Sequence, residues 1–149
     1  MYKKILVPVE NSLYDDAIID HVAELARICK SQVVLIHVAD GWAARNISQL
    51  KLRESEEIRK DREYIEKLAD DLEKKGIEAD ALLASGDPAT EIAEAAAREG
   101  CDLIAMSTHG HKFIGDMIHG SVAHTVRHAS TVPVLLVRGS SRGRIGKVT

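Results

Sequence analysis

The sequence predicts one α/β domain built on an open, five-stranded parallel sheet with helices on both faces, a Rossmann-like arrangement. Three observations predict it. The 149 residues suit a single domain. Short apolar runs alternate with longer amphipathic segments, as strands and helices do in β-α-β units. The first apolar run is continuous instead of alternating with polar residues, which is typical of strands buried on both faces.

The first three elements follow from apolar patterning. Residues 5–9 form a continuous apolar run, which predicts a buried strand. Residues 13–29 repeat apolar side chains at helical spacing. Asp15 and Asp16 lie in the first turn of that helix, where the helix dipole favours negative charge. Residues 33–38 are the second predicted strand.

The middle of the chain continues the alternation. Residues 40–50 are expected to be a long connection without regular structure, followed by a charged helix that Gly76 caps at its C-terminus. Residues 77–84 are a third, weaker strand. Asp87–Pro88 opens the next helix, with Asp as N-cap and Pro at the first helical position. Residues 102–106 are the fourth strand.

The last part of the chain holds a glycine-containing loop, a helix and a strand. The loop is expected over residues 108–119, the short helix over 121–129 and the fifth strand over 132–137. Residues 139–149 lack periodicity and contain several arginines, so we expect a flexible basic tail. The folded domain is therefore expected to span residues 1–138.

The expected strand order is 3-2-1-4-5, with right-handed crossovers. This order reverses direction between the first and fourth strands, and ligands bind at such a reversal, beyond the carboxyl ends of the strands. Two segments meet there, Pro8–Ser12 and Ser107–Val122.

These two segments lack several well-known motifs. No G-x-G-x-x-G turn follows the first strand, and no G-x-S-x-G elbow surrounds Ser12 or Ser121. Gly115 and Gly120 have P-loop spacing, but the lysine is missing.

A glycine loop that runs into a helix start remains. Unpaired N–H groups of Gly120, Ser121 and Val122 would form an anion site there. Gly110 has no side chain, so the loop backbone could approach a phosphate closely. On the alternative interpretation the glycines only make turns and Ser121 only caps the helix.

Residues 2–137 resemble the universal stress protein family. The resemblance rests on the start Lys4-Ile5-Leu6-Val7-Pro8-Val9, on His37-Val38, and on a Ser107-x2-Gly110-x9-Gly120-Ser121 segment. Nucleotide-binding members carry G-x2-G-x9-G-(S/T) in that segment. The resemblance implies an adenine nucleotide alpha-hydrolase-like fold, ATP as ligand and a homodimer. The residues that would hold the nucleotide are Pro8, Val9, Glu10, Val38, Met106, Ser107, His109, Gly110, His111, Gly120, Ser121 and Val122.

Two residues depart from the family pattern. Ser107 stands at the first glycine; a positive φ there would cost about 1 kcal/mol, whereas an ordinary φ would only add a hydroxyl. Glu10 stands where binding members usually have Asp, and it reaches one methylene further. Glu10 could hold a Mg²⁺ or Mn²⁺ that arrives with the nucleotide, in a protein without a dedicated metal site.

Three functions stay open at this point. The first is a cytoplasmic, homodimeric stress-response module that binds ATP or another adenine nucleotide and signals to a protein partner. The dimer would pair the exposed fifth strand, Val132 to Val137, with its copy. The second is a dimeric scaffold of the same family that binds no nucleotide. The third is a slow ATPase or self-phosphorylating protein that uses Glu10, although no catalytic residues are expected.

Composition excludes other classes. A net charge of -3 and 3% aromatic residues argue against a nucleic-acid binder. No apolar run is long enough to span a membrane, and the N-terminus does not resemble a signal peptide. Cys29 and Cys101 suit free thiols in a reducing cytoplasm. His124 and His128 have metal-ligating spacing, but without a third ligand we expect ordinary surface histidines.

Overall fold

The structure is a computed structural model that describes residues 1–40, 47–109 and 114–139; for residues 40, 47–55, 109 and 114–121 it describes the backbone alone. Residues 110–113 of the expected loop and residues 140–149 of the expected tail lie outside this range. The elements are β1 (Lys4–Pro8), α1 (Asp15–Cys29), β2 (Gln32–Asp40), α3 (Ile47–Lys74), β3 (Ala79–Gly86), α4 (Pro88–Glu99), β4 (Leu103–His109), α5 (Ile114–Ala129) and β5 (Val134–Gly139).

The described strands form one five-stranded sheet in the order β3-β2-β1-β4-β5. Every neighbouring pair is parallel, so each connection crosses over the sheet. The predicted fold class and strand order are therefore confirmed. The order reverses between β1 and β4, which places the carboxyl ends of these two strands at the expected ligand position.

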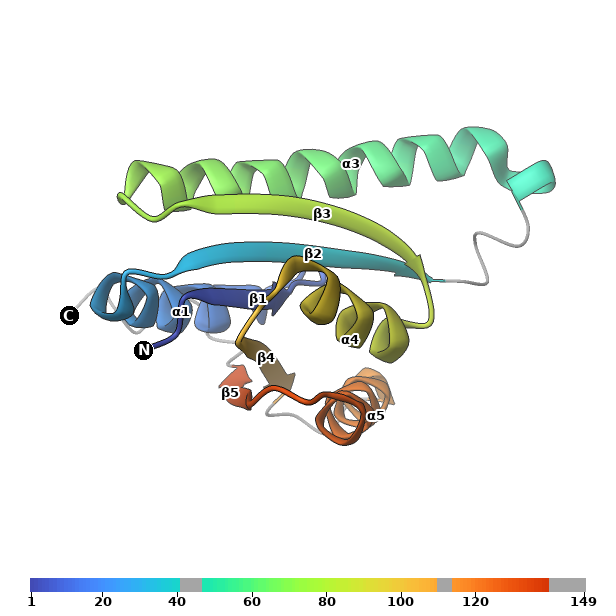
Figure 1. Cartoon of the computed structure of the whole chain (residues 1–149). Coiled ribbons are helices and arrows are strands. Elements are labelled where there is room, and N and C mark those ends of the chain that lie inside the picture. The colour runs from blue at the N-terminus through green and yellow to red at the C-terminus, as the bar shows by residue number, and fades with distance from the viewer. Residues whose placement is uncertain (41–46, 110–113, 140–149) are drawn as a thin grey trace.

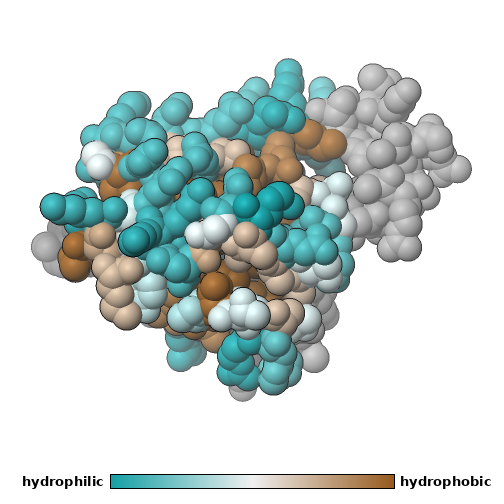
Figure 2. Space-filling view, in the orientation of Figure 1, coloured by the Kyte–Doolittle hydropathy of each residue, from teal (hydrophilic) through white to brown (hydrophobic). Residues whose placement is uncertain are grey.

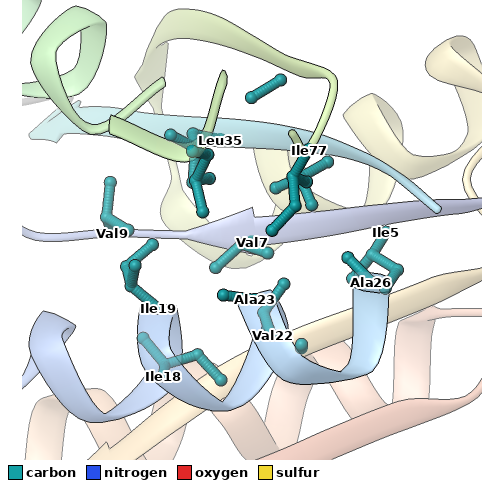
Figure 3. Close-up of a cluster of buried hydrophobic side chains, with 14 of the residues drawn as sticks. Ile5, Val7, Val9, Ile18, Ile19, Val22, Ala23, Ala26, Leu35 and Ile77 are labelled. Carbon is teal, nitrogen blue, oxygen red and sulfur yellow. The ribbon is translucent and has the colours of Figure 1, made fainter. Parts of the chain in front are cut away.

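Two helical layers cover the sheet (Figure 1). On one face α1 and α3 pack on Ile5 and Val7 of β1, and Figure 3 shows the α1 side chains that meet these residues. On the other face α4 and α5 pack on Leu6. All three β1 residues are fully buried, because successive side chains of a strand point to opposite faces and both faces are covered.

The N-terminal cap of α4 follows the prediction. The Asp87 side chain accepts a hydrogen bond from the Thr90 N–H at 3.0 Å, and Pro88 is the first helical residue. Gly100 ends the helix with a φ of 69°, a left-handed conformation that glycine adopts without strain.

Three strands begin later than predicted, β4 by a single residue, at Leu103 instead of Asp102. β3 starts at Ala79 instead of Ile77, because the Ile77 N–H bonds back to the Leu72 carbonyl at the end of α3. β5 starts at Val134, directly after Pro133, which has no N–H to donate to the ladder. The Pro133 carbonyl still accepts from the Ile104 N–H.

Two helices begin earlier than predicted. α3 starts at Ile47, inside the segment expected to be an irregular connection. α5 starts at Ile114 instead of Ser121, so most of the expected loop 108–119 is regular structure. β4 also runs to His109, three residues beyond the predicted end. The glycines of this region favoured a loop in the sequence, but two of them, Gly115 and Gly120, lie inside the helix.

The outer side of α3 is charged, and hydrophilic residues follow its edge of the molecule in Figure 2. Its inner side buries Ile65, Ala69 and Leu72 in the core. The predicted charged helix is therefore present, and its charged residues form a solvated face.

Candidate functional site

A cleft of about 130 Å³ opens at the carboxyl ends of β1, β2 and β4, where the strand order reverses. Its lining combines segments far apart in the chain: Pro8, Val9, Glu10, Ile36, His37, Val38, Pro88, Ile92, Met106, Ser107 and Val122. Whole ligand sites usually measure about 300–1,000 Å³. The described part of the cleft therefore accommodates only one end of a nucleotide-sized ligand.

Seven of the twelve predicted site residues line this cleft: Pro8, Val9, Glu10, Val38, Met106, Ser107 and Val122. His109, Gly120 and Ser121 are described by their backbone alone, and Gly110 and His111 lie outside the described residues. The sequence did not indicate Ile36, Pro88 or Ile92. Pro88 was identified only as a helix start, and the position of that helix beside β2 brings Pro88 and Ile92 to the cleft.

The β1–α1 loop, residues 9–14, lines the cleft with Val9 and Glu10. The Val9 N–H still donates to the Ile36 carbonyl of β2 at 2.9 Å. Asn11 then takes a φ of 62°, in the left-handed region that Asn tolerates better than most residues. The chain thus leaves the sheet sharply and enters α1 after three further residues.

The buried carboxylate of Asp15 holds this loop. It accepts hydrogen bonds from the backbone N–H of Glu10 at 3.1 Å and of Ser12 at 3.1 Å, and the residue is 2% exposed. The N-cap residue Tyr14 makes no side-chain cap bond. Asp15 therefore bonds back to the preceding loop, a role beyond the predicted interaction with the helix dipole.

The third donor to Asp15 comes from α3. The Tyr64 hydroxyl donates to Asp15 Oδ2 at 2.6 Å. Burial, this hydrogen bond and the negative charges of Asp15 and Asp16 raise the pKa of Tyr64 above its ordinary value. Three donors on one carboxylate satisfy a charge that would otherwise be costly to bury.

His37 connects the opposite side of the loop to α3. Its Nδ1 lies 2.9 Å from the Val9 carbonyl oxygen, and its Nε2 lies 3.1 Å from Asp61 Oδ2. His37 is therefore a hydrogen-bonded side chain at the margin of the core. The partners on α3 were not predicted.

The structure answers the question that Ser107 raised. Ser107 lies within β4 and is not one of the described non-glycine residues with positive φ, so it is not strained. Its Oγ is buried and has no hydrogen-bond partner among the described residues. An unpaired buried hydroxyl in the wall of a cleft suits a ligand that supplies the missing partner.

The start of α5 changes the expected phosphate site. Because α5 begins at Ile114, the amides of Gly120, Ser121 and Val122 lie beyond its first turn. Only the first four N–H groups of a helix lack an internal partner. In this form these three amides are part of the helix, and a phosphate reaches them only if the preceding turns unwind.

Other features of the described chain offer weaker sites. A larger, open depression of about 720 Å³ follows the exposed side of α1 as far as Lys75, but none of the predicted site residues lines it. The rings of His124 and His128 contact edge to face with centroids 4.5 Å apart, and the described residues contain no group of three or more potential metal ligands. Burial raises the pKa of the Cys101 thiol to about 11, as expected of an inert core cysteine. None of the described helices is long and apolar enough to cross a membrane.

Known proteins resemble the chain over nearly its whole length. The model of the universal stress protein family matches residues 1–138. Universal stress protein MJ0577 of Methanocaldococcus jannaschii is 32% identical, over 93% of this chain and 96% of that protein. Universal stress protein YxiE of Bacillus subtilis is 30% identical, over 93% of this chain and 100% of that protein.

Solved structures show the same fold. The structure of MJ0577 matches with a TM-score of 0.79 at 28% identity, covering 95% of this chain and 99% of that chain. A universal stress protein from Archaeoglobus fulgidus in complex with dAMP matches with a TM-score of 0.69 at 22% identity, covering 91% of this chain and 97% of that chain. A universal stress protein in complex with cAMP matches with a TM-score of 0.67 at 18% identity, covering 93% of this chain and 98% of that chain.

Proposed function

Since the chain belongs to the universal stress protein family, we propose that it binds ATP or another adenine nucleotide in the cleft between β1 and β4. The observation that carries this proposal is the convergence of seven predicted site residues, from four separate segments, on one cleft. Fold relatives in complex with dAMP and cAMP support the choice of an adenine nucleotide.

The lining suggests how the ligand would lie. Val9, Val38 and Met106 are apolar and suit the base, and Glu10 at the exposed rim suits the ribose or a metal ion that accompanies the phosphates. The phosphates would extend toward α5, and the residues that we propose to hold them are Gly110, His111, Gly120, Ser121 and Val122. The first turns of α5 would unwind to expose the last three amides.

The biological role follows from this binding. We propose a cytoplasmic homodimer in which the nucleotide changes the order at the start of α5, and a partner protein reads that change. Glu10 is the one carboxylate among the described lining residues, so the chemistry would be at most slow ATP hydrolysis, with Mg²⁺ or Mn²⁺ brought by the nucleotide.

A second candidate is a dimeric scaffold of the same family that binds no nucleotide. Two observations favour it: the small volume of the described cleft and the inclusion of the Gly120 amide in α5. In that case α5 would keep its first turns permanently.

Calorimetric titration of the purified chain with ATP, ADP, AMP and GTP, each with Mg²⁺, tests the proposal. We expect adenine nucleotides to bind with dissociation constants below about 1 mM. GTP should bind more weakly, because the wall proposed for the base is apolar and would leave polar groups of guanine without partners. Analysis of nucleotide released on denaturing freshly purified protein is an independent check. No binding of any adenine nucleotide at millimolar concentration would favour the scaffold.

A further inference from the structure

Two residues of α3 contact the β1–α1 loop, each through one intermediate side chain. Tyr64 acts through Asp15, which accepts from the N–H of Glu10 and Ser12. Asp61 acts through His37, which bonds the carbonyl of Val9. One connection therefore holds N–H groups of the loop and the other holds a C=O group.

The Tyr64 connection fixes a part of the loop that no longer pairs with a strand. After Val9 the loop leaves the ladder with β2, and Asn11 has a positive φ that few non-glycine residues adopt. A loop with such a backbone keeps one conformation only if its surroundings fix it. The carboxylate of Asp15 does this at two amides, and the short bond from Tyr64 fixes the carboxylate in turn.

The Asp61 connection depends on the histidine ring. Each ring nitrogen of His37 faces an acceptor, Val9 O at 2.9 Å and Asp61 Oδ2 at 3.1 Å. Contacts at both ring nitrogens fix the orientation of the ring, so Asp61 holds the imidazole against the Val9 carbonyl.

We propose that Tyr64 and Asp61 are positioning residues of the cleft: from α3 they fix the loop that contacts the base and ribose of the ligand. This inference deepens the proposed function. The effect of Tyr64 and Asp61 on nucleotide affinity rests on the proposed nucleotide binding. Coupling between sites is reciprocal, so a nucleotide that orders the loop also strengthens the contact with α3. The long helix α3 is then the element that senses whether the cleft is occupied.

Tyr64→Phe removes only the hydroxyl, and Asp61→Asn keeps an acceptor while removing the charge. Two variants serve as matched controls: Tyr2→Phe for the loss of a hydroxyl and Glu66→Gln for the loss of a charge at an exposed position of α3. The first measurement is amide exchange by NMR in the protein without nucleotide. Tyr64→Phe should speed exchange at Glu10 and Ser12 by about fivefold, the effect of losing one ordinary hydrogen bond. Exchange that is unchanged at both amides would overturn the proposal.

The second measurement is the dissociation constant for AMP, taken well below the unfolding temperature so that a merely structural loss of stability leaves it unchanged. Tyr64→Phe and Asp61→Asn should each weaken AMP by about three- to tenfold, while the two controls bind as the wild type does. Variants that bind AMP as tightly as the wild type would overturn the inference. If the wild type binds no adenine nucleotide, the proposed function and the affinity effect fail together, and amide exchange still decides whether α3 positions the loop.

Discussion

The Oγ of Ser107 lies 2.9 Å from the point that a Cβ atom on Gly139 would occupy. The ring of Tyr14 approaches the same point to 2.9 Å, so the end of β5 fits closely between β4 and the start of α1. Any side chain at residue 139 would disturb this packing beside the cleft.

Gly139→Ala should therefore destabilise the protein by about 1–3 kcal/mol, the usual effect of adding a methyl group to a filled site. Chemical denaturation measures this free energy of unfolding. Adding Ser107→Gly should restore only part of it, because the Tyr14 ring remains in place. Full stability of Gly139→Ala alone would contradict the close packing.

Ser107→Ala should have the opposite effect on stability. It removes a buried hydroxyl without a partner among the described residues, so the free energy of unfolding should rise by about 1 kcal/mol. If the hydroxyl pairs with the nucleotide, the same variant should bind ATP more weakly. A variant that is both less stable and unchanged in ATP affinity would show that the hydroxyl has a structural partner.

Asp102 should give the protein part of its resistance to acid. Burial raises the pKa of this carboxyl, but hydrogen bonds from the N–H of Lys3 and Lys4 outweigh burial and hold the pKa below its ordinary value. A lowered folded-state pKa adds stability above the unfolded-state pKa of about 3.9, and this stability is lost as the pH falls through the folded-state value. Asp102→Asn should thus be less stable than the wild type at pH 7, and the difference should shrink below about pH 4. Denaturation curves that differ by the same amount at pH 7 and pH 3 would contradict this account.

Leu136 of β5 tests the proposed dimer. Its side chain is 41% exposed on the outermost strand of the sheet, and pairing of β5 with its copy would bring the second protomer close to it. Leu136→Lys should shift the protein from dimer to monomer in analytical ultracentrifugation, with Leu13→Lys, an exposed leucine outside β5, as control. Dimers that persist in Leu136→Lys, or a wild type that is monomeric at every concentration, would contradict pairing through β5.

The sequence predicted the interior of the fold better than its edges. The continuous apolar run around Leu6 indicated a strand covered on both sides, and from such strands the sheet order and the position of the cleft followed. The predicted start of α5 was wrong. The low helix propensity of glycine favoured a loop, whereas the helix includes Gly115 and Gly120.

The contacts between α3 and the cleft could not be predicted for a different reason. Tyr64 and Asp15 are 49 residues apart, and only the packing of α3 beside α1 brings their side chains together. Periodicity identifies which face of a helix is buried, but not which polar side chain at its margin meets which partner.

Calorimetric titration of the wild type and of Gly120→Val with ATP and Mg²⁺ tests the central claim most directly. A valine at this helical position should leave the fold intact and block the approach of phosphates, with Ala97→Val, at an exposed position of α4 that does not line the cleft, as a control for a valine in a helix. We predict binding by the wild type and the control, and affinity reduced by at least about tenfold in Gly120→Val. Equal ATP affinity in the wild type and in Gly120→Val would contradict the proposed path of the phosphates, and no binding by the wild type at millimolar ATP would contradict a nucleotide site in this cleft.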